Sequence, residues 1–170
     1  MKKFCFLLLM LPLFVVAQKN ADHGARTFVD NYQKINTFEA LLKKLEGRTV
    51  YIDLWATWCG PCVAEFAHKD ALHDFAAKND IDLLYISMDQ DKDDHKWKKF
   101  IERRELSGMH MRVNKALYTD IQKKFSQTVQ GQRVFGIPYY IIVKDGEIVL
   151  KDAPRPSSGE LLFTELINYK

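Results

Sequence analysis

The chain has 170 residues, of which 47% are hydrophobic and 28% are charged, and its formal net charge is +3. This length and composition suit one globular domain with a hydrophobic core and exclude a disordered or fibrous protein. Basic pairs such as Lys43-Lys44 and Arg103-Arg104 lie among acidic residues in helix-like stretches, which is typical of solvated helix faces. The charge pattern therefore gives no indication of nucleic-acid binding.

The first 17 residues predict a signal peptide. Lys2 and Lys3 precede an apolar run that ends at the small residue Ala17, and we expect cleavage after Ala17. An uncleaved membrane anchor is the alternative, although the run is shorter than the roughly 20 residues that span a bilayer. Residues 18–26 are polar and predict a flexible tether, and residues 27–170 form the predicted folded domain.

The rest of the chain predicts alternating strands and helices. In chain order these are an edge strand over 27–35, a helix over 36–47, a strand over 49–55, a helix over 61–78, a strand over 81–88, and helices over 93–106 and 115–125. A polar loop over 127–132 precedes strands over 139–143 and 147–150, which the hairpin turn Asp145-Gly146 joins. The last predicted helix covers 157–169, with Ser157 or Ser158 as its N-cap.

This order of elements predicts an α/β fold. We expect a central mixed sheet of four to five strands with helices on both faces and a C-terminal hairpin plus helix. The acidic segment 89–94 is predicted to be a solvated turn, because its spacing does not match that of an EF-hand calcium loop.

Cys59 and Cys62 are the residues most suggestive of chemistry. Cys5 lies in the predicted signal peptide, so these two would be the only cysteines of the exported chain. A single closely spaced pair in an oxidising compartment fits a redox catalyst. A structural zinc ion would need two further ligands, and the sequence has no second cysteine pair.

The two cysteines have different expected roles. Pro61 is tolerated in a first helical turn, which places Cys59 at a helix N-terminus. The helix dipole and free N–H groups there lower a cysteine pKa from about 8.5 to roughly 3.5–7.5. We therefore expect Cys59 to attack and Cys62, one turn further in, to resolve the mixed disulfide.

Two acidic residues lie close to this pair in the predicted structure. Asp53 is in an apolar strand on the same alternating face as Tyr51 and Trp55, so we expect burial, which raises a carboxyl pKa. Glu65 comes three residues after Cys62 and therefore lies on the same side of the helix. Asp53 is our candidate acceptor for the Cys62 proton.

The segment Trp58-Cys59-Gly60-Pro61-Cys62 resembles the active site of the thioredoxin superfamily. The wider pattern resembles the exported TlpA/ResA type of thiol-disulfide oxidoreductase, part of the redoxin group. The features that carry this likeness are the signal segment, Cys59-Gly60-Pro61-Cys62 with Glu65 three residues on, the insert after Ile86-Ser87-Met88-Asp89, Gly136-Ile137-Pro138 and the late hairpin. The chain departs from that type at Asp53, where a neutral residue is common, and at Ala67, where a proline is frequent.

The resemblance implies a thioredoxin-like fold and a substrate-binding surface around the cysteine pair. It implies a cis Pro138 that faces the pair, with the backbone of Ile137 binding an extended substrate and Trp58, Gly60 and Pro61 completing the surface. Asp53 matches the buried acid of thioredoxin by position. A glutamate at the position of Glu65 is thought to tune the cysteines.

Each of these assignments has a plainer alternative. In the alternative interpretation, Pro138 is a trans proline at the start of an edge strand. Asp53 is a hydrogen-bonded residue at a strand end and has no catalytic role. Glu65 is then a surface residue of its helix. Trp55, which we expect to support the cysteine loop, is then a residue of the core alone.

The expected function is that of an exported, periplasmic thiol-disulfide oxidoreductase, with the direction of exchange left open. It needs no cofactor beyond the Cys59-Cys62 pair and no metal. Its expected partners are protein thiols and disulfides and a membrane-bound electron donor, and we expect a monomer. The alternatives are a thiol peroxidase, although Thr57 lies two rather than three residues before Cys59, and a Cu(I) carrier that uses both thiolates.

Overall fold

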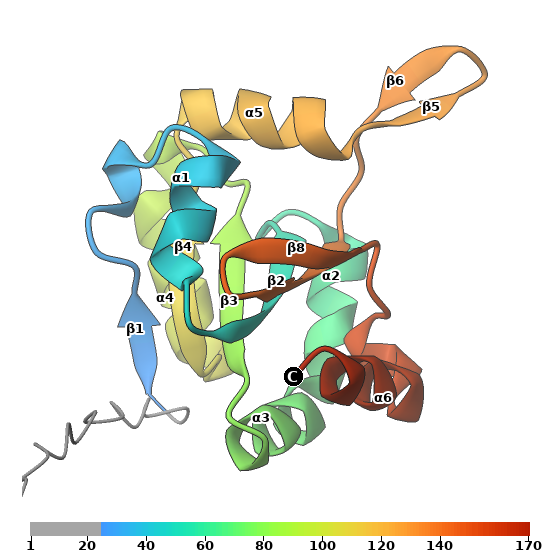
Figure 1. Cartoon of the computed structure of the whole chain (residues 1–170). Helices are drawn as coiled ribbons and strands as arrows, with labels where there is room; N and C mark the ends of the chain where they lie inside the picture. The colour runs from blue at the N-terminus through green and yellow to red at the C-terminus, as the bar shows by residue number, and fades with distance from the viewer. Residues whose placement is uncertain (1–24) are drawn as a thin grey trace, which may run out of the picture.

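A computed structural model describes residues 25–170, and Figure 1 shows its arrangement. The α-helices are α1 Phe38–Leu42, α2 Gly60–Glu65, α3 Lys69–Lys78, α4 Asp94–Arg104, α5 Lys115–Phe125 and α6 Glu160–Asn168. The strands are β1 Arg26–Phe28, β2 Thr49–Trp55, β3 Asp82–Ser87, β4 Gly108–Arg112, β5 Gln127–Val129, β6 Gln132–Val134, β7 Tyr139–Lys144 and β8 Glu147–Lys151. Short 3-10 turns are η1 Tyr32–Lys34, η2 Lys43–Leu45, η3 Phe66–His68, η4 Asp91–Asp93 and η5 Pro156–Ser158.

The core of the described fold is a mixed sheet with the strand order β1-β4-β3-β2-β7-β8. β1, β4, β3 and β2 are parallel, whereas β7 is antiparallel to β2 and β8 antiparallel to β7. The Asp145-Gly146 hairpin between β7 and β8 is as predicted, and both residues have positive φ values. The predicted α/β fold is confirmed, but the sheet has six strands rather than four to five.

Helices cover both faces of this sheet, as predicted. On one face Phe38 of α1 packs edge-on against Phe125 of α5, which in turn contacts Tyr139 of β7. On the other face the ring of Phe66 contacts Trp55 of β2 and Tyr85 of β3. The central strand β2 is therefore buried on both sides, and its C-terminal end leads directly into the cysteine segment.

Three predicted helices are shorter or interrupted. The helix expected over 61–78 consists of α2, the 3-10 turn η3 and α3, and the helix over 36–47 consists of α1 and η2. The last helix begins at α6, and its N-cap is Gly159, so the predicted caps Ser157 and Ser158 are wrong. The 3-10 turn η5, Pro156–Ser158, comes directly before Gly159.

The strand predictions were wrong in three places. The edge strand expected over 27–35 is the three-residue β1, followed by η1. The strand β4 was not predicted, although it joins β1 to β3 in the sheet. The polar loop expected over 127–132 is the hairpin β5–β6, which extends away from the main sheet in Figure 1.

The predicted signal peptide and most of the predicted tether lie outside the described residues. β1 begins at Arg26, the last residue of that tether. Within residues 25–170, no helix combines the length and the apolar character that a membrane span requires.

Candidate active site

The cysteine pair lies where β2 gives way to α2, as the sequence predicts. Cys59 is the N-cap of α2, and its Sγ accepts a hydrogen bond from the Cys62 backbone N–H at 3.2 Å. A disulfide joins Cys59 to Cys62, with an S–S distance of 2.02 Å. The first cysteine sulfur therefore faces the N–H groups at the start of a helix, where a thiolate is favoured in the reduced protein.

The two sulfurs differ in their exposure. Cys59 is 6% exposed and Cys62 is completely buried. Gly60 and Pro61, in the first turn of α2, are both exposed, and Trp58 beside them is 62% exposed. A reaction partner can therefore reach Cys59 but not Cys62, which matches the predicted order of attack and resolution.

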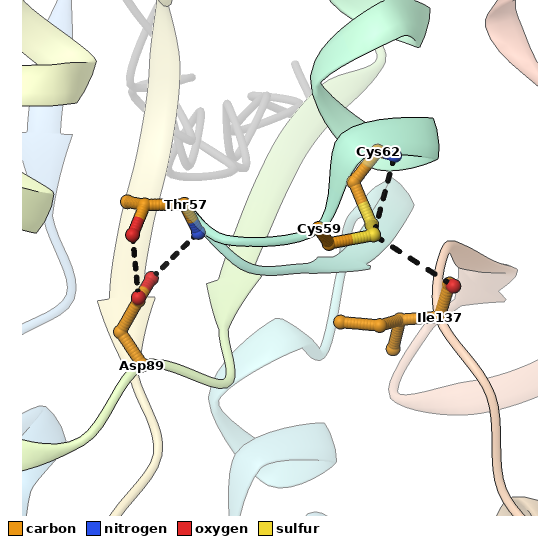
Figure 2. Close-up of a disulfide and its surroundings, with 5 residues drawn as sticks. All are labelled: Thr57, Cys59, Cys62, Asp89 and Ile137. Carbon is orange, nitrogen blue, oxygen red and sulfur yellow. Dashed lines mark hydrogen bonds between the residues drawn. A yellow bond between two sulfur atoms is a disulfide. The ribbon is translucent and has the colours of Figure 1, made fainter.

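The loop before β7 lies opposite the cysteine pair. The Ile137-Pro138 peptide bond is cis, as the resemblance implies, so the trans alternative for Pro138 is wrong. The carbonyl oxygen of Ile137 lies 3.7 Å from Cys59 Sγ (Figure 2). Both Ile137 and Pro138 are partly buried, and the loop borders the sulfur on the side away from Thr57.

Asp53 is buried in the middle of β2, as predicted. Its strand neighbours are Tyr85 on one side and Tyr140 on the other. Among the described residues its Oδ1 has no hydrogen-bond partner. Burial and, secondarily, the charge of Glu65 raise the pKa of Asp53 well above 3.8. The carboxyl group therefore keeps its proton to a higher pH than an exposed aspartate does.

Glu65 is buried, so its interpretation as a surface residue is wrong. Its Oε2 accepts a hydrogen bond from the backbone N–H of Ser157 at 2.9 Å, and its Oε1 accepts one from the Ser157 hydroxyl at 3.0 Å. Ser157 therefore joins the active-site helix to the segment before α6, which explains why it does not cap α6.

The prediction of a solvated turn missed Asp89. This residue is 1% exposed, and its carboxylate accepts hydrogen bonds from both the backbone N–H and the hydroxyl of Thr57. A signal was present in the sequence, because Asp89 follows the strand that ends at Ser87, this strand is parallel to β2, and the carboxyl ends of parallel strands meet at one sheet edge. Within residues 25–170, no group of three or more His, Cys, Asp or Glu side chains is arranged to hold a metal ion.

Comparison with known proteins gives a consistent assignment. The redoxin family model matches residues 24–161. The chain is 27% identical over 116 residues to the thiol-disulfide oxidoreductase ResA of Bacillus thuringiensis, covering 64% of this chain and 56% of that protein. It is 30% identical over 57 residues to ResA of Oceanobacillus iheyensis, covering 34% of this chain and 30% of that protein. The chain thus spans about half or less of the length of these curated relatives.

A solved structure covers more of the chain. A crystal structure of a candidate thiol-disulfide oxidoreductase from Bacteroides vulgatus is 32% identical, with a TM-score of 0.56. The match covers 76% of this chain and 83% of that one. The family match spans the sheet, the cysteine pair and the cis-proline loop described above. The chain therefore belongs to the redoxin family.

Proposed function

We propose that this protein exchanges thiols and disulfides with other proteins through Cys59 and Cys62. The observation that carries this proposal is the unequal pair itself: a disulfide whose partly accessible sulfur caps a helix and whose partner is buried. The names of the related proteins, thiol-disulfide oxidoreductases, support the same chemistry.

The first step uses the reduced protein. The Cys59 thiolate attacks one sulfur of a substrate disulfide, which forms a mixed disulfide and releases the other substrate sulfur as a thiolate. The N–H groups at the start of α2 stabilise the Cys59 thiolate, and the hydrogen bond from the Cys62 N–H is one such contact.

The second step closes the internal disulfide. Cys62 loses its proton and attacks Cys59 Sγ, and the bond between Cys59 and the substrate breaks with release of the second substrate thiolate. Two electrons have then passed from the protein to the substrate. Asp53, whose raised pKa suits a proton acceptor, takes the Cys62 proton, and the neighbouring charge of Glu65 helps to set that pKa.

Substrate binding is assigned to the exposed surface around Cys59. The backbone of Ile137 offers hydrogen bonds to an extended polypeptide, as in other cases of strand-like recognition. Trp58 presents a large exposed apolar side chain beside the sulfur, and Gly60 and Pro61 leave the approach open. Such a surface makes few demands on the side chains of a substrate.

The cellular setting is part of the proposal. The basic start and the apolar run of the first 17 residues support export to the periplasm. A reductant in an oxidising compartment needs a source of electrons, so we assign a membrane-bound donor as its partner. We further propose that the domain acts as a monomer.

Reduction of insulin disulfides tests this function. We expect turnover by the protein with a dithiol donor, no turnover by Cys59→Ala, and accumulation of a Cys59-linked mixed disulfide by Cys62→Ala. Inactivity of the native chain together with no trapped partner would contradict the proposal. Peroxide consumption or tight Cu(I) binding by such an inactive chain would support one of the alternative functions instead.

A further inference from the structure

The buried carboxylate of Asp89 accepts hydrogen bonds from the active-site loop, which is the segment between β2 and Cys59. Asp89 Oδ2 accepts a hydrogen bond from the Thr57 backbone N–H at 2.9 Å, and Asp89 Oδ1 accepts one from the Thr57 hydroxyl at 2.7 Å. Figure 2 shows both bonds on the side of the loop away from Ile137. One side chain therefore fixes both the backbone and the hydroxyl of a residue two positions before Cys59.

Ser87 fixes the orientation of this carboxylate. The Ser87 hydroxyl donates to Asp89 Oδ2 at 2.6 Å and accepts from the Asp89 backbone N–H at 3.0 Å. Ser87 is completely buried. A buried carboxylate is tolerated only when hydrogen bonds compensate its loss of water, and here three donors do so. Two of those three donors belong to Thr57.

Backbone hydrogen bonds hold the chain on both sides of Thr57. The Met88 N–H donates to the Trp55 carbonyl oxygen at 2.7 Å, and the Cys59 N–H donates to the Ala56 carbonyl oxygen at 3.1 Å. The segment from β2 to Cys59 is thus a tight turn whose middle residue is held by Asp89. Because Thr57 lies only two residues before Cys59, a change in the position of Thr57 would also move Cys59 Sγ.

An ion pair supports the other end of the segment that carries Asp89. Arg112, at the end of β4, is nearly buried and donates to Asp91 Oδ1 at 2.6 Å. Arg112 is also the strand neighbour of Ser87. The acidic segment is therefore bound to the sheet on one side and to the active-site loop on the other.

We infer that Asp89 is a positioning residue, which acts through Thr57 to hold the Cys59 sulfur at the N-terminus of α2. This inference rests on the proposed role of Cys59 as the attacking thiolate. Asp89 does not contact a substrate, and its effect is on the fraction of Cys59 that is ionised and on the rate of its attack.

Thr57→Val isolates this effect. Valine has the shape of threonine but lacks the hydroxyl donor, so it removes the bond to Asp89 Oδ1 and leaves the negative charge of Asp89 in place. The last point matters because removal of a nearby negative charge, as in Asp89→Asn, by itself lowers a thiol pKa and opposes the loss of positioning.

The measurement is the pH dependence of Cys59 alkylation by iodoacetamide in the reduced full chain. We expect Thr57→Val to raise the Cys59 pKa by at least about half a unit, which is a roughly threefold loss of thiolate below that pKa. The value of kcat for insulin reduction falls with it, while KM stays the same. Thr57→Ser restores the hydroxyl and the native pKa.

Two further variants separate positioning from general destabilisation. Thr119→Val removes a matched hydroxyl, which donates to the Lys115 carbonyl oxygen in α5, and leaves the Cys59 pKa unchanged. Ser87→Ala removes the donor to Asp89 Oδ2 without altering the loop sequence and raises the pKa in the same direction as Thr57→Val. Near-ultraviolet circular dichroism identifies the variants that are folded.

The inference is overturned if folded Thr57→Val and Ser87→Ala both keep the native Cys59 pKa and kcat. A native protein that neither reduces insulin nor yields a trapped partner, yet shows the pKa change in Thr57→Val, would instead contradict the proposed function and leave the positioning role intact.

Discussion

Asp53 is a buried carboxyl group whose environment offers little compensation for a charge. Among the described residues its Oδ1 has no hydrogen-bond partner, and neither has the buried hydroxyl of its strand neighbour Tyr140. Burial raises the pKa of Asp53 well above 3.8, and the charge of Glu65 adds to the effect. The folded protein therefore holds a proton on this group at pH values where the unfolded chain has lost it.

Replacement of Asp53 by asparagine should stabilise the protein at neutral pH. Because the folded-state pKa is raised, the native chain loses stability as pH rises from about 3.8 toward that pKa, and the loss is complete above it. We expect Asp53→Asn to increase the free energy of unfolding at pH 7, because the amide carries no charge to be buried. The gain should shrink toward zero near pH 4, as measured by urea denaturation at both pH values. A variant less stable than the native protein at pH 7 would contradict this account.

The sequence was informative about Asp53 because strand alternation alone decides which face a residue occupies. The sequence was less informative about Glu65. Helical spacing shows on which side of its helix Glu65 lies, but not that Ser157, 92 residues away, donates two hydrogen bonds to it. Asp89 was misread for a related reason. A run of aspartates has the composition of a solvated turn. Only the parallel pairing of β2 and β3 brings Asp89, the first residue of that run, into contact with the active-site loop.

At the scale of elements, the active-site helix and α6 form one layer. The rings of Phe75 in α3 and Phe163 in α6 stack at a centroid distance of 4.3 Å, and Glu65 contacts Ser157 just before α6. The C-terminal helix therefore helps to hold α2 and α3 in place. Loss of the packing of α6 should therefore disturb the active site and lower the free energy of unfolding.

Two adjacent leucines of α6 provide a matched test of this packing. Leu162 is completely buried, whereas Leu161 is 59% exposed. We expect Leu162→Ala to lower the free energy of unfolding by about 2 to 5 kcal/mol, because it leaves a cavity in the core. Leu161→Ala should change it by less than about 0.5 kcal/mol. Equal effects of the two substitutions in urea denaturation would show that α6 does not pack as described.

Elements with regular apolar patterns were predictable, and those without them were not. The strands β2, β3 and β7 are rich in Ile, Leu, Val and Tyr, whereas β4 reads Gly-Met-His-Met-Arg and lacks such a pattern. Its place in the sheet depends on pairing with β3, which is a tertiary contact. The hairpin β5–β6 is exposed and polar, so its sequence has the composition of a loop.

At the scale of the whole molecule, the buried groups of the sheet make stability depend on pH in opposite directions. His110 of β4 is fully buried and stacks on Tyr85, and its Nε2 donates to the Leu106 carbonyl oxygen at 3.0 Å. Its Nδ1 has no hydrogen-bond partner among residues 25–170. Burial lowers the pKa of His110 to about 4, so the ring is neutral in the folded protein.

This histidine should destabilise the fold in acid. The unfolded chain takes up a proton below pH 6.5 and the folded chain only near pH 4, so stability is complete above pH 6.5 and is lost as pH falls through this window. Between pH 7 and pH 4 the native protein should lose about 3 kcal/mol relative to His110→Gln. Because Asp53 is present in both proteins, its opposing contribution cancels when their free energies of unfolding are subtracted. A difference that does not vary with pH would contradict the assignment of a neutral, buried ring.

The overall architecture followed from the sequence because alternating strands and helices allow few arrangements, and the cysteine segment marks the end of the central strand. The number of strands did not follow, since β4, which lies between β1 and β3 in the sheet, lacks an apolar pattern of its own and takes its place through these two pairings.

The pKa of Cys59 in the reduced protein tests the central claim most directly. It can be measured from the pH dependence of iodoacetamide alkylation in the Cys62→Ala variant, where Cys59 is the reacting thiol of the folded domain. A helix N-cap sulfur that accepts an N–H hydrogen bond should titrate between roughly 3.5 and 7.5. A value near 8.5, that of an ordinary cysteine, would contradict the proposal that α2 activates this sulfur.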